Sequence, residues 1–269
     1  MKKNAIIVGM PRSGTSLTTS IFTTNGYFAA SPESGELRKG DEYNPLGYFE
    51  AQTLINANSR VFSRIGFPHD NTWLYSPLSN DQAREIHNLK PLEEDQKLVS
   101  FYNQHSPWVW KDPRLCYTLA YWSQLIDWDQ TCVLLLKRKP SDIYRSFMRL
   151  GWRTPGRKGR KDVYDRVEEH IQFAESSIQR YGLPHITIDY ADFEKRPHWI
   201  RQQLADHFGL ELEPEQLNYS RSYNHSTLKG KISTVIKIIT DRIPLPLVKL
   251  GKALLPRRIL RWLFPEKSL

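Results

Sequence analysis

The stretch GMPRSGTS at residues 9–16 decides the fold, because it joins an apolar run to a helical pattern. The run AIIV at residues 5–8 is typical of a short buried strand, and Leu17 and Ile21 are four residues apart, as on one face of a helix. A strand, a glycine-containing loop and a helix in this order surround an anion with backbone N–H groups and the positive end of the helix. The sequence therefore predicts a phosphate-binding loop.

This loop departs from the phosphate-binding loop of nucleotide hydrolases at one position. Gly9 and Gly14 are five residues apart, as the pattern G-x-x-x-x-G-K-[ST] requires, but Thr15 occupies the place of the lysine. In kinases and hydrolases that lysine contacts the β- and γ-phosphates, so its loss argues against a ligand with a γ-phosphate. Arg12 stands inside the loop instead, and we expect it to face the group attached to the bound phosphate.

Apolar runs and helical patterns alternate along the chain. Further strands are predicted at residues 107–110, 131–136 and 185–189, and a long helix at 162–181. Strands of continuous apolar character separated by helices are typical of a parallel sheet covered on both faces. The predicted class is α/β, a P-loop-like three-layer fold with a central, mainly parallel sheet flanked by helices. The stretch 151–161 has three glycines, five basic residues and no periodicity, and is predicted to be a loop.

A second motif is predicted where a buried strand leads into a helix. Arg138 follows the strand and Ser146 comes eight residues later. The stretches NPLGYFE at 44–50 and WVWKDPRLCYTLAYW at 108–122 stand between this motif and the first loop. Together the motifs resemble the sulfotransferases that use 3′-phosphoadenosine 5′-phosphosulfate (PAPS). Bacterial members of that family commonly show GMxRSGTSL, N-P-x-G-Y-F-E and W-x-W-K-D-P-R in this order.

The resemblance extends from residue 5 to about residue 210 and implies how the donor binds. The residues implied for the 5′-phosphosulfate are those of the first loop: Pro11, Arg12, Ser13, Gly14, Thr15 and Ser16. Arg138 and Ser146 would hold the 3′-phosphate, and Tyr190 matches a tyrosine that lies near the adenine in the family. PAPS has no γ-phosphate and needs no magnesium bridge, so no metal site is expected.

Two cations are candidates for stabilising the transition state of sulfuryl transfer. Arg12 and Lys111 are both predicted at strand ends on one rim of the sheet, where open parallel sheets bind their ligands. Cations there would stabilise the charge that develops on the bridging oxygen of the leaving phosphate. Cytosolic eukaryotic members use a histidine base that would fall at Pro113, so this chain must use another group.

Glu33 and Glu50 are equally good candidates for the base. Glu33 lies 21 residues after the loop arginine, similar to the glutamate base of tyrosylprotein sulfotransferases, and Glu50 ends the GYFE stretch. Asp112 and His69 are weaker candidates, and Asp112 could instead pair with Arg114. The residues alone leave this choice open.

The C-terminal segment carries most of the positive charge. Residues 229–269 contain ten basic and two acidic residues, against a formal net charge of +9 for the chain. Apolar residues are interleaved with the basic ones, and prolines divide the segment into short pieces, a pattern suited to an anionic membrane surface. Packing of these apolar residues on the domain is the alternative. The predicted organisation is a sulfotransferase domain at 1–228 and a basic amphipathic tail at 229–269.

The resulting prediction is an enzyme that moves a sulfuryl group from PAPS by in-line displacement. Its acceptor would be a hydroxyl of a glycan, a glycolipid or another small alcohol, in a pocket that residues 60–105 help to shape. The alternatives are a P-loop nucleotide kinase or hydrolase and a basic membrane- or nucleic-acid-binding module; no nucleic-acid partner is expected. No uncharged run reaches the roughly 20 residues of a spanning helix, so we expect a cytoplasmic protein, membrane-associated only at the inner face.

Overall fold

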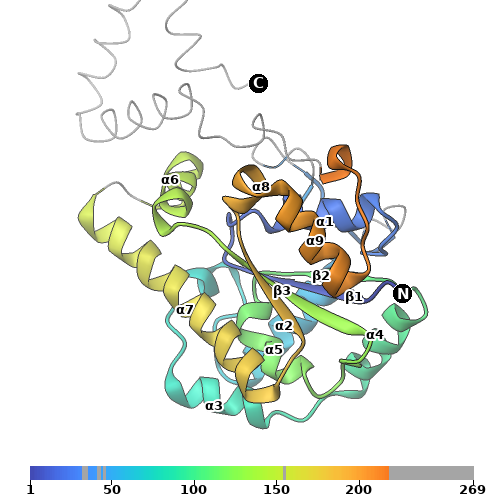
Figure 1. Cartoon of the computed structure of the whole chain (residues 1–269). Coiled ribbons are helices and arrows are strands. Elements are labelled where there is room, and N and C mark those ends of the chain that lie inside the picture. The colour runs from blue at the N-terminus through green and yellow to red at the C-terminus, as the bar shows by residue number, and fades with distance from the viewer. Residues whose placement is uncertain (32–35, 41–43, 45–46, 154–155, 218–269) are drawn as a thin grey trace, which may run out of the picture.

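A computed structural model describes residues 1–31, 36–40, 44, 47–153 and 156–217 of the 269-residue chain (Figure 1). The predicted tail at 229–269, the boundary at residue 228 and Glu33 lie outside these residues. In chain order the elements are β1 (Asn4–Val8), α1 (Thr15–Thr24), α2 (Gln52–Arg64), η1 (Asn71–Tyr75, a 3₁₀ helix), α3 (Asn80–Asn88), α4 (Glu93–Asn103), β2 (Val109–Lys111), α5 (Leu115–Trp122), β3 (Thr131–Lys137), α6 (Pro140–Leu150), α7 (Arg157–Tyr181), β4 (His185–Asp189), α8 (Asp192–Lys195), α9 (Pro197–Phe208) and η2 (Pro214–Leu217, also 3₁₀).

The described strands form one parallel sheet in the order β2-β1-β3-β4. Ile6 at the centre of β1 lies opposite Trp110 of β2 on one side and Val133 of β3 on the other. Leu135 of β3 lies opposite Thr187 of β4. The predicted parallel sheet is confirmed, and each predicted strand overlaps an observed one.

Side chains of the strands alternate between two apolar layers. Ala5 and Ile7 pack with residues of α1 and α9, whereas Ile6 and Val8 pack with residues of α2, α5 and α7, and all four are fully buried. Figure 1 shows α1, α8 and α9 on one side of the sheet and α2, α5 and α7 on the other. Burying one Ile or Val side chain contributes roughly 1.5–3 kcal/mol, so both layers stabilise the sheet. The predicted three-layer fold is confirmed.

The prediction of a loop throughout 151–161 is wrong in its second half. Helix α6 ends at Leu150 with Gly151 as its C-cap, whose φ of 71° is the left-handed conformation that favours glycine, but α7 already begins at Arg157. The first turns of α7 bury Gly159 and Val163, and α7 packs against both α5 and α6. Tertiary packing thus extends the helix into a stretch without a helical apolar pattern.

The parallel strands place four chain segments on one edge of the sheet. Val8, Lys111, Lys137 and Asp189 are the last residues of β1, β2, β3 and β4. The phosphate-loop sequence, Asp112, Arg138 and Tyr190 follow directly after these ends. Sites in open parallel sheets lie at this edge.

Candidate active site

The loop after β1 presents backbone donors at the start of α1. Helix α1 begins at Thr15 with Gly14 as its N-cap, without a side-chain cap and without an acidic residue in its first turn. The first N–H groups of a helix have no partner within the helix, so these groups and the positive helix end can bind an anion. Arg12 has a φ of 70°, which costs a non-glycine residue energy. Its carbonyl accepts a hydrogen bond from Arg138 Nη1 at 2.9 Å, which helps to hold this conformation.

Both glycines of the loop are required by close packing. A Cβ atom on Gly9 would lie 2.8 Å from the carbonyl oxygen of Leu136. A Cβ atom on Gly14 would lie 2.2 Å from the ring of Tyr190, and the φ of Gly14 is 104°. The Tyr190 ring therefore packs on the loop itself, and the guanidinium of Arg138 lies over this ring, 4.5 Å from its centroid.

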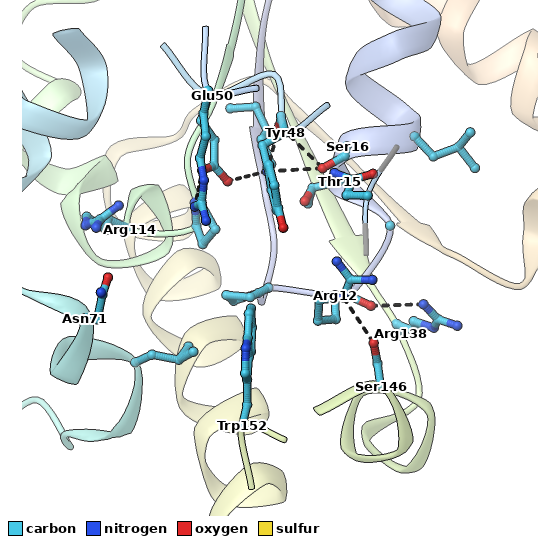
Figure 2. A pocket seen from close by; sticks show the side chains of 18 of the residues that line it. Arg12, Thr15, Ser16, Tyr48, Glu50, Asn71, Arg114, Arg138, Ser146 and Trp152 are labelled. Atoms are coloured by element: carbon cyan, nitrogen blue, oxygen red, sulfur yellow. Dashed lines mark hydrogen bonds and ion pairs between the residues drawn. The ribbon is translucent and has the colours of Figure 1, made fainter. Parts of the chain in front are cut away.

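The two predicted parts of the donor site meet in the structure. Arg12 Nε donates a hydrogen bond to Ser146 Oγ at 3.0 Å, across 134 positions of sequence (Figure 2). Arg149, from the same helix as Ser146, also lines this end of the pocket. Burial and then the nearby charges of Arg12, Arg138 and Arg145 lower the pKa of Arg149 to about 10. Positive charges that lie this close repel one another, and a bound anion would reduce that repulsion.

Arg149 is a site residue that the sequence reasoning missed. It lies three positions after Ser146 in the predicted helix, so both share one helix face. That spacing was the signal that could have identified it.

Lys111 and Glu50 form a buried ion pair beside the loop. Lys111 Nζ lies 2.5 Å from Glu50 Oε1, and donates hydrogen bonds to the Tyr48 carbonyl at 3.1 Å and to Ser16 Oγ at 3.4 Å. Arg38 Nη1 lies 3.2 Å from Glu50 Oε2. Burial acts to raise the pKa of Glu50, but the attraction of Lys111 and Arg38 outweighs it and holds the pKa below its usual range. Glu50 is therefore a carboxylate held between two cations.

The remaining candidates for the base lie elsewhere. Asp112 is fully buried and accepts hydrogen bonds from Arg114 Nη1 at 3.0 Å and from Asn58 Nδ2 at 3.0 Å. It therefore forms the pair with Arg114 that the sequence reasoning gave as its other role. His69 is exposed and is not among the residues that line the pocket. Glu33 lies outside the described residues.

One pocket of about 440 Å³ joins these groups, a size typical of small-molecule sites. Five of the six loop residues line it (Pro11, Arg12, Gly14, Thr15 and Ser16), as do Glu50, Lys111, Arg138, Ser146 and Tyr190. The buried hydroxyl of Ser13 does not line it and has no hydrogen-bond partner within the described part of the chain. Asn71, Trp73, Leu74 and Tyr75 line the pocket from the segment 60–105.

Several residues on the other walls of the pocket were not predicted from the sequence. These are Arg38, Asn44, Tyr48, Arg114 and Trp152. Figure 2 shows Arg12, Arg138 and Ser146 at one end of the pocket, and Asn71 and Arg114 at the other. Of these missed residues, Asn44, Tyr48 and Arg114 belong to the two motif stretches, whereas no sequence motif marks Arg38 or Trp152.

A comparison with protein families finds that the model described as the sulfotransferase family matches residues 5–214. The chain belongs to the sulfotransferase family. As predicted, it is an enzyme of the PAPS-dependent sulfotransferases, not a nucleotide kinase or hydrolase. Within the described ranges, no group of His, Cys, Asp or Glu is arranged to hold a metal ion. No helix there combines the length and the apolar character needed to cross a bilayer.

A comparison with solved structures finds matches to further sulfotransferases. The sulfotransferase domain from the curacin biosynthetic pathway is 16% identical, with 86% of this chain and 82% of that chain covered and a TM-score of 0.47. The sulfotransferase STF1 from Mycobacterium tuberculosis is 13% identical, with 88% of this chain and 76% of that chain covered and a TM-score of 0.48. The sulfotransferase domain of the Synechococcus PCC 7002 olefin synthase is 17% identical, with 91% of this chain and 98% of that chain covered and a TM-score of 0.42. A comparison with curated proteins gave no match.

Proposed function

We propose that this sulfotransferase binds PAPS with the 5′-phosphosulfate on residues 11–16 and the 3′-phosphate on Arg138 and Ser146. The observation that carries the assignment is the cluster of Arg12, Arg138, Ser146 and Arg149 beside the uncapped start of α1. These residues fit a donor with two separate anionic groups. Arg149 is added to the 3′-phosphate site because it lies close to Arg12 and Arg138 and lines the same end of the pocket.

Catalysis is assigned to Arg12, Lys111 and Glu50. The bound donor supplies an activated sulfuryl group, and the leaving phosphate gains negative charge at its bridging oxygen. Arg12 and Lys111 donate hydrogen bonds toward this charge and stabilise the transition state more than the ground state. As Lys111 turns to the donor, Glu50 loses a cationic partner and its pKa rises. Glu50 then accepts the proton of the acceptor hydroxyl at a carboxylate oxygen. Glu33 remains the alternative base.

Calorimetry and a transfer assay test this assignment together. Adenosine 3′,5′-bisphosphate (PAP) is expected to bind without magnesium, and more tightly than adenosine 5′-phosphate, because only PAP carries the 3′-phosphate. Glu50→Gln and Glu33→Gln are then compared for transfer of labelled sulfate at saturating PAPS. If Glu50→Gln retains the rate and Glu33→Gln loses it, Glu33 is the base. Equal affinity for the two nucleotides would contradict the 3′-phosphate site.

The acceptor and the cellular setting belong to the same proposal. The acceptor is a hydroxyl of a glycan, a glycolipid or a small alcohol, and the enzyme is cytoplasmic. Residues 1–228 form the enzyme domain, and the basic tail at 229–269 brings it to the anionic inner face of a membrane, with about 1 kcal/mol from each Lys or Arg near the surface. Co-sedimentation with vesicles tests the tail: binding to anionic vesicles that weakens with salt supports it. Equal binding to neutral vesicles contradicts it.

A further inference from the structure

The end of the pocket away from the phosphate loop has a polar and aromatic wall that the donor assignment does not use. Asn71 comes from η1, Arg114 follows β2, and Trp152 lies between α6 and α7. Figure 2 shows the Trp152 ring between the Arg12–Ser146 side and the Asn71–Arg114 side. A group bound here would therefore lie next to the proposed site of sulfuryl transfer.

The arginine that lines this end of the pocket, Arg114, is paired within the protein. Arg114 Nη1 lies 3.0 Å from Asp112 Oδ1, and Asn71 is uncharged. The repelling cations gather at the opposite end, where Arg138 and Arg149 lie. An anionic acceptor would add a negative charge beside the buried Asp112 carboxylate. This arrangement favours an acceptor without charge.

Some hydrogen-bonding groups of the side chains at this end have no partner within the described part of the protein. In the described part of the chain, Arg114 bonds other side chains through Nη1 only, its buried Nε has no hydrogen-bond partner, and the exposed side chain of Asn71 has no partner within the protein. An apolar alcohol such as a sterol would cover these groups and leave them unsatisfied, which costs about 1–3 kcal/mol for each buried group. An acceptor with several hydroxyls would satisfy them.

Aromatic side chains complete the wall. Trp152 is half-buried, with its ring edge-to-face against Phe147 at 5.2 Å between centroids. Trp73 and Tyr75 line the same part of the pocket, under the guanidinium groups of Arg114 and Arg153 respectively. A flat apolar surface next to planar hydrogen-bonding groups matches a sugar ring, which has C–H faces and a rim of hydroxyls.

We propose that Trp152, Asn71 and Arg114 form a saccharide subsite, so that the acceptor hydroxyl belongs to an uncharged sugar ring. The inference rests on the proposed sulfotransfer function and narrows its acceptor. Trp152 stacks on the ring, while Asn71 and Arg114 bind its hydroxyls. All three are acceptor-binding residues.

Saturation-transfer NMR on the full chain with PAP tests the subsite. The probes are methyl glycosides of glucose, galactose and mannose, the methyl glycoside of glucuronic acid, and cyclohexanol. We expect at least one neutral hexoside to bind more tightly than the glucuronide and cyclohexanol. Trp152→Ala should weaken that binding about tenfold or more, and Asn71→Ala a few-fold, with PAP affinity unchanged within twofold. Trp152→Phe should retain most of the binding, which separates a stacking role from a folding defect.

Trp199→Ala is the matched control, because Trp199 is half-buried like Trp152 but lies outside the pocket. It should leave hexoside binding unchanged. Binding of no hexoside, tighter binding of cyclohexanol or the glucuronide, or unchanged hexoside binding in a folded Trp152→Ala variant would overturn the inference. Failure of the wild-type chain to bind PAP would instead contradict the proposed donor site, and hexoside binding measured without PAP would still test the subsite.

Discussion

The two ends of the pocket recognise their ligands by different means. The donor end combines backbone N–H groups of the α1 terminus with a group of arginines, in which burial and the neighbouring charges lower the pKa of Arg149. The opposite end combines aromatic rings with an arginine whose charge is already matched by Asp112. The first end gathers cations, whereas the arginine of the second is paired with a carboxylate. The proposed sites would thus separate an anionic donor from an uncharged acceptor within one cavity.

The two ends also differ in their supporting structure. The donor end is held by close backbone packing, with Tyr190 against Gly14 and a left-handed Arg12. The acceptor end depends on side-chain packing beneath it, where Trp73 contacts the buried His170. Variants of the two ends should therefore change different properties of the protein.

Lys111 lies between the two ends, and its loss should have the largest effect. Lys111→Ala should lower turnover at saturating PAPS by about 10²–10³-fold, the scale of a lost transition-state contact. PAP affinity should change much less, since Lys111 acts on the transferring group. Because Glu50 would keep only Arg38 as a partner, a melting curve must accompany the assay. If PAP affinity and turnover fell by the same factor, Lys111 would act in donor binding and not on the transition state.

Gly14→Ala should disrupt the donor end while the acceptor end stays intact. The new Cβ would overlap the Tyr190 ring in a left-handed backbone, at a cost of about 2–3 kcal/mol in the free energy of unfolding. Gly66→Ala is the matched control, because Gly66 is also left-handed at φ 62° but has open space around it. That variant should lose only about 1 kcal/mol and keep PAP binding. Urea denaturation measures the free energy of unfolding of each variant, and calorimetry measures its PAP binding. Equal losses in the two variants would show that the contact between Gly14 and Tyr190 is not the cause.

Arg138→Ala should weaken PAP binding by about 1.5–3 kcal/mol, because it removes a charge-assisted contact to the 3′-phosphate. Binding of adenosine 5′-phosphate, which lacks this group, should change little. Calorimetry with both nucleotides gives the comparison. Equal losses for both would indicate that Arg138 acts by holding the Arg12 carbonyl or the Tyr190 ring.

Acid should loosen the acceptor end through His170. Burial lowers the pKa of His170 to about 3, so between its usual value of 6.5 and 3 the unfolded chain binds the extra proton. His170 therefore reduces stability as the pH falls through this window, by up to about 1.4 kcal/mol per pH unit. The lowered pKa of Glu50 has a separate effect, because its stabilising contribution is lost only as the pH falls below its usual value of 4.5.

Urea denaturation of the wild type and His170→Gln between pH 7 and pH 5 measures this difference. The wild type should lose more stability than the variant over the window. Hydrogen exchange should rise first in η1, which packs against His170 through Trp73. Identical pH profiles for the two proteins would show that His170 does not set the acid response.

The sequence alone determined the sheet and most of the donor end. A buried strand, a glycine loop and a helix form a local pattern, and parallel strands bring their carboxyl ends to one edge whatever the details of packing. The residues after the ends of β1, β3 and β4 were therefore predictable, including Arg12, Arg138 and Tyr190. Ser146 was predicted from the resemblance to the sulfotransferase family, since its spacing after Arg138 is a weak signal by itself.

Only the tertiary structure decided which charges pair and what forms the acceptor end. Glu50 meets Lys111 across 61 positions, and the carboxylate of Asp112 takes Arg114 and Asn58 as partners. Asn71, Arg114 and Trp152 come from three separate segments that no local pattern connects. The start of α7 at Arg157 likewise depends on packing against α5 and α6. These contacts form when distant surfaces are buried together, and the free energy of that burial cannot be read from the spacing of residues along the chain.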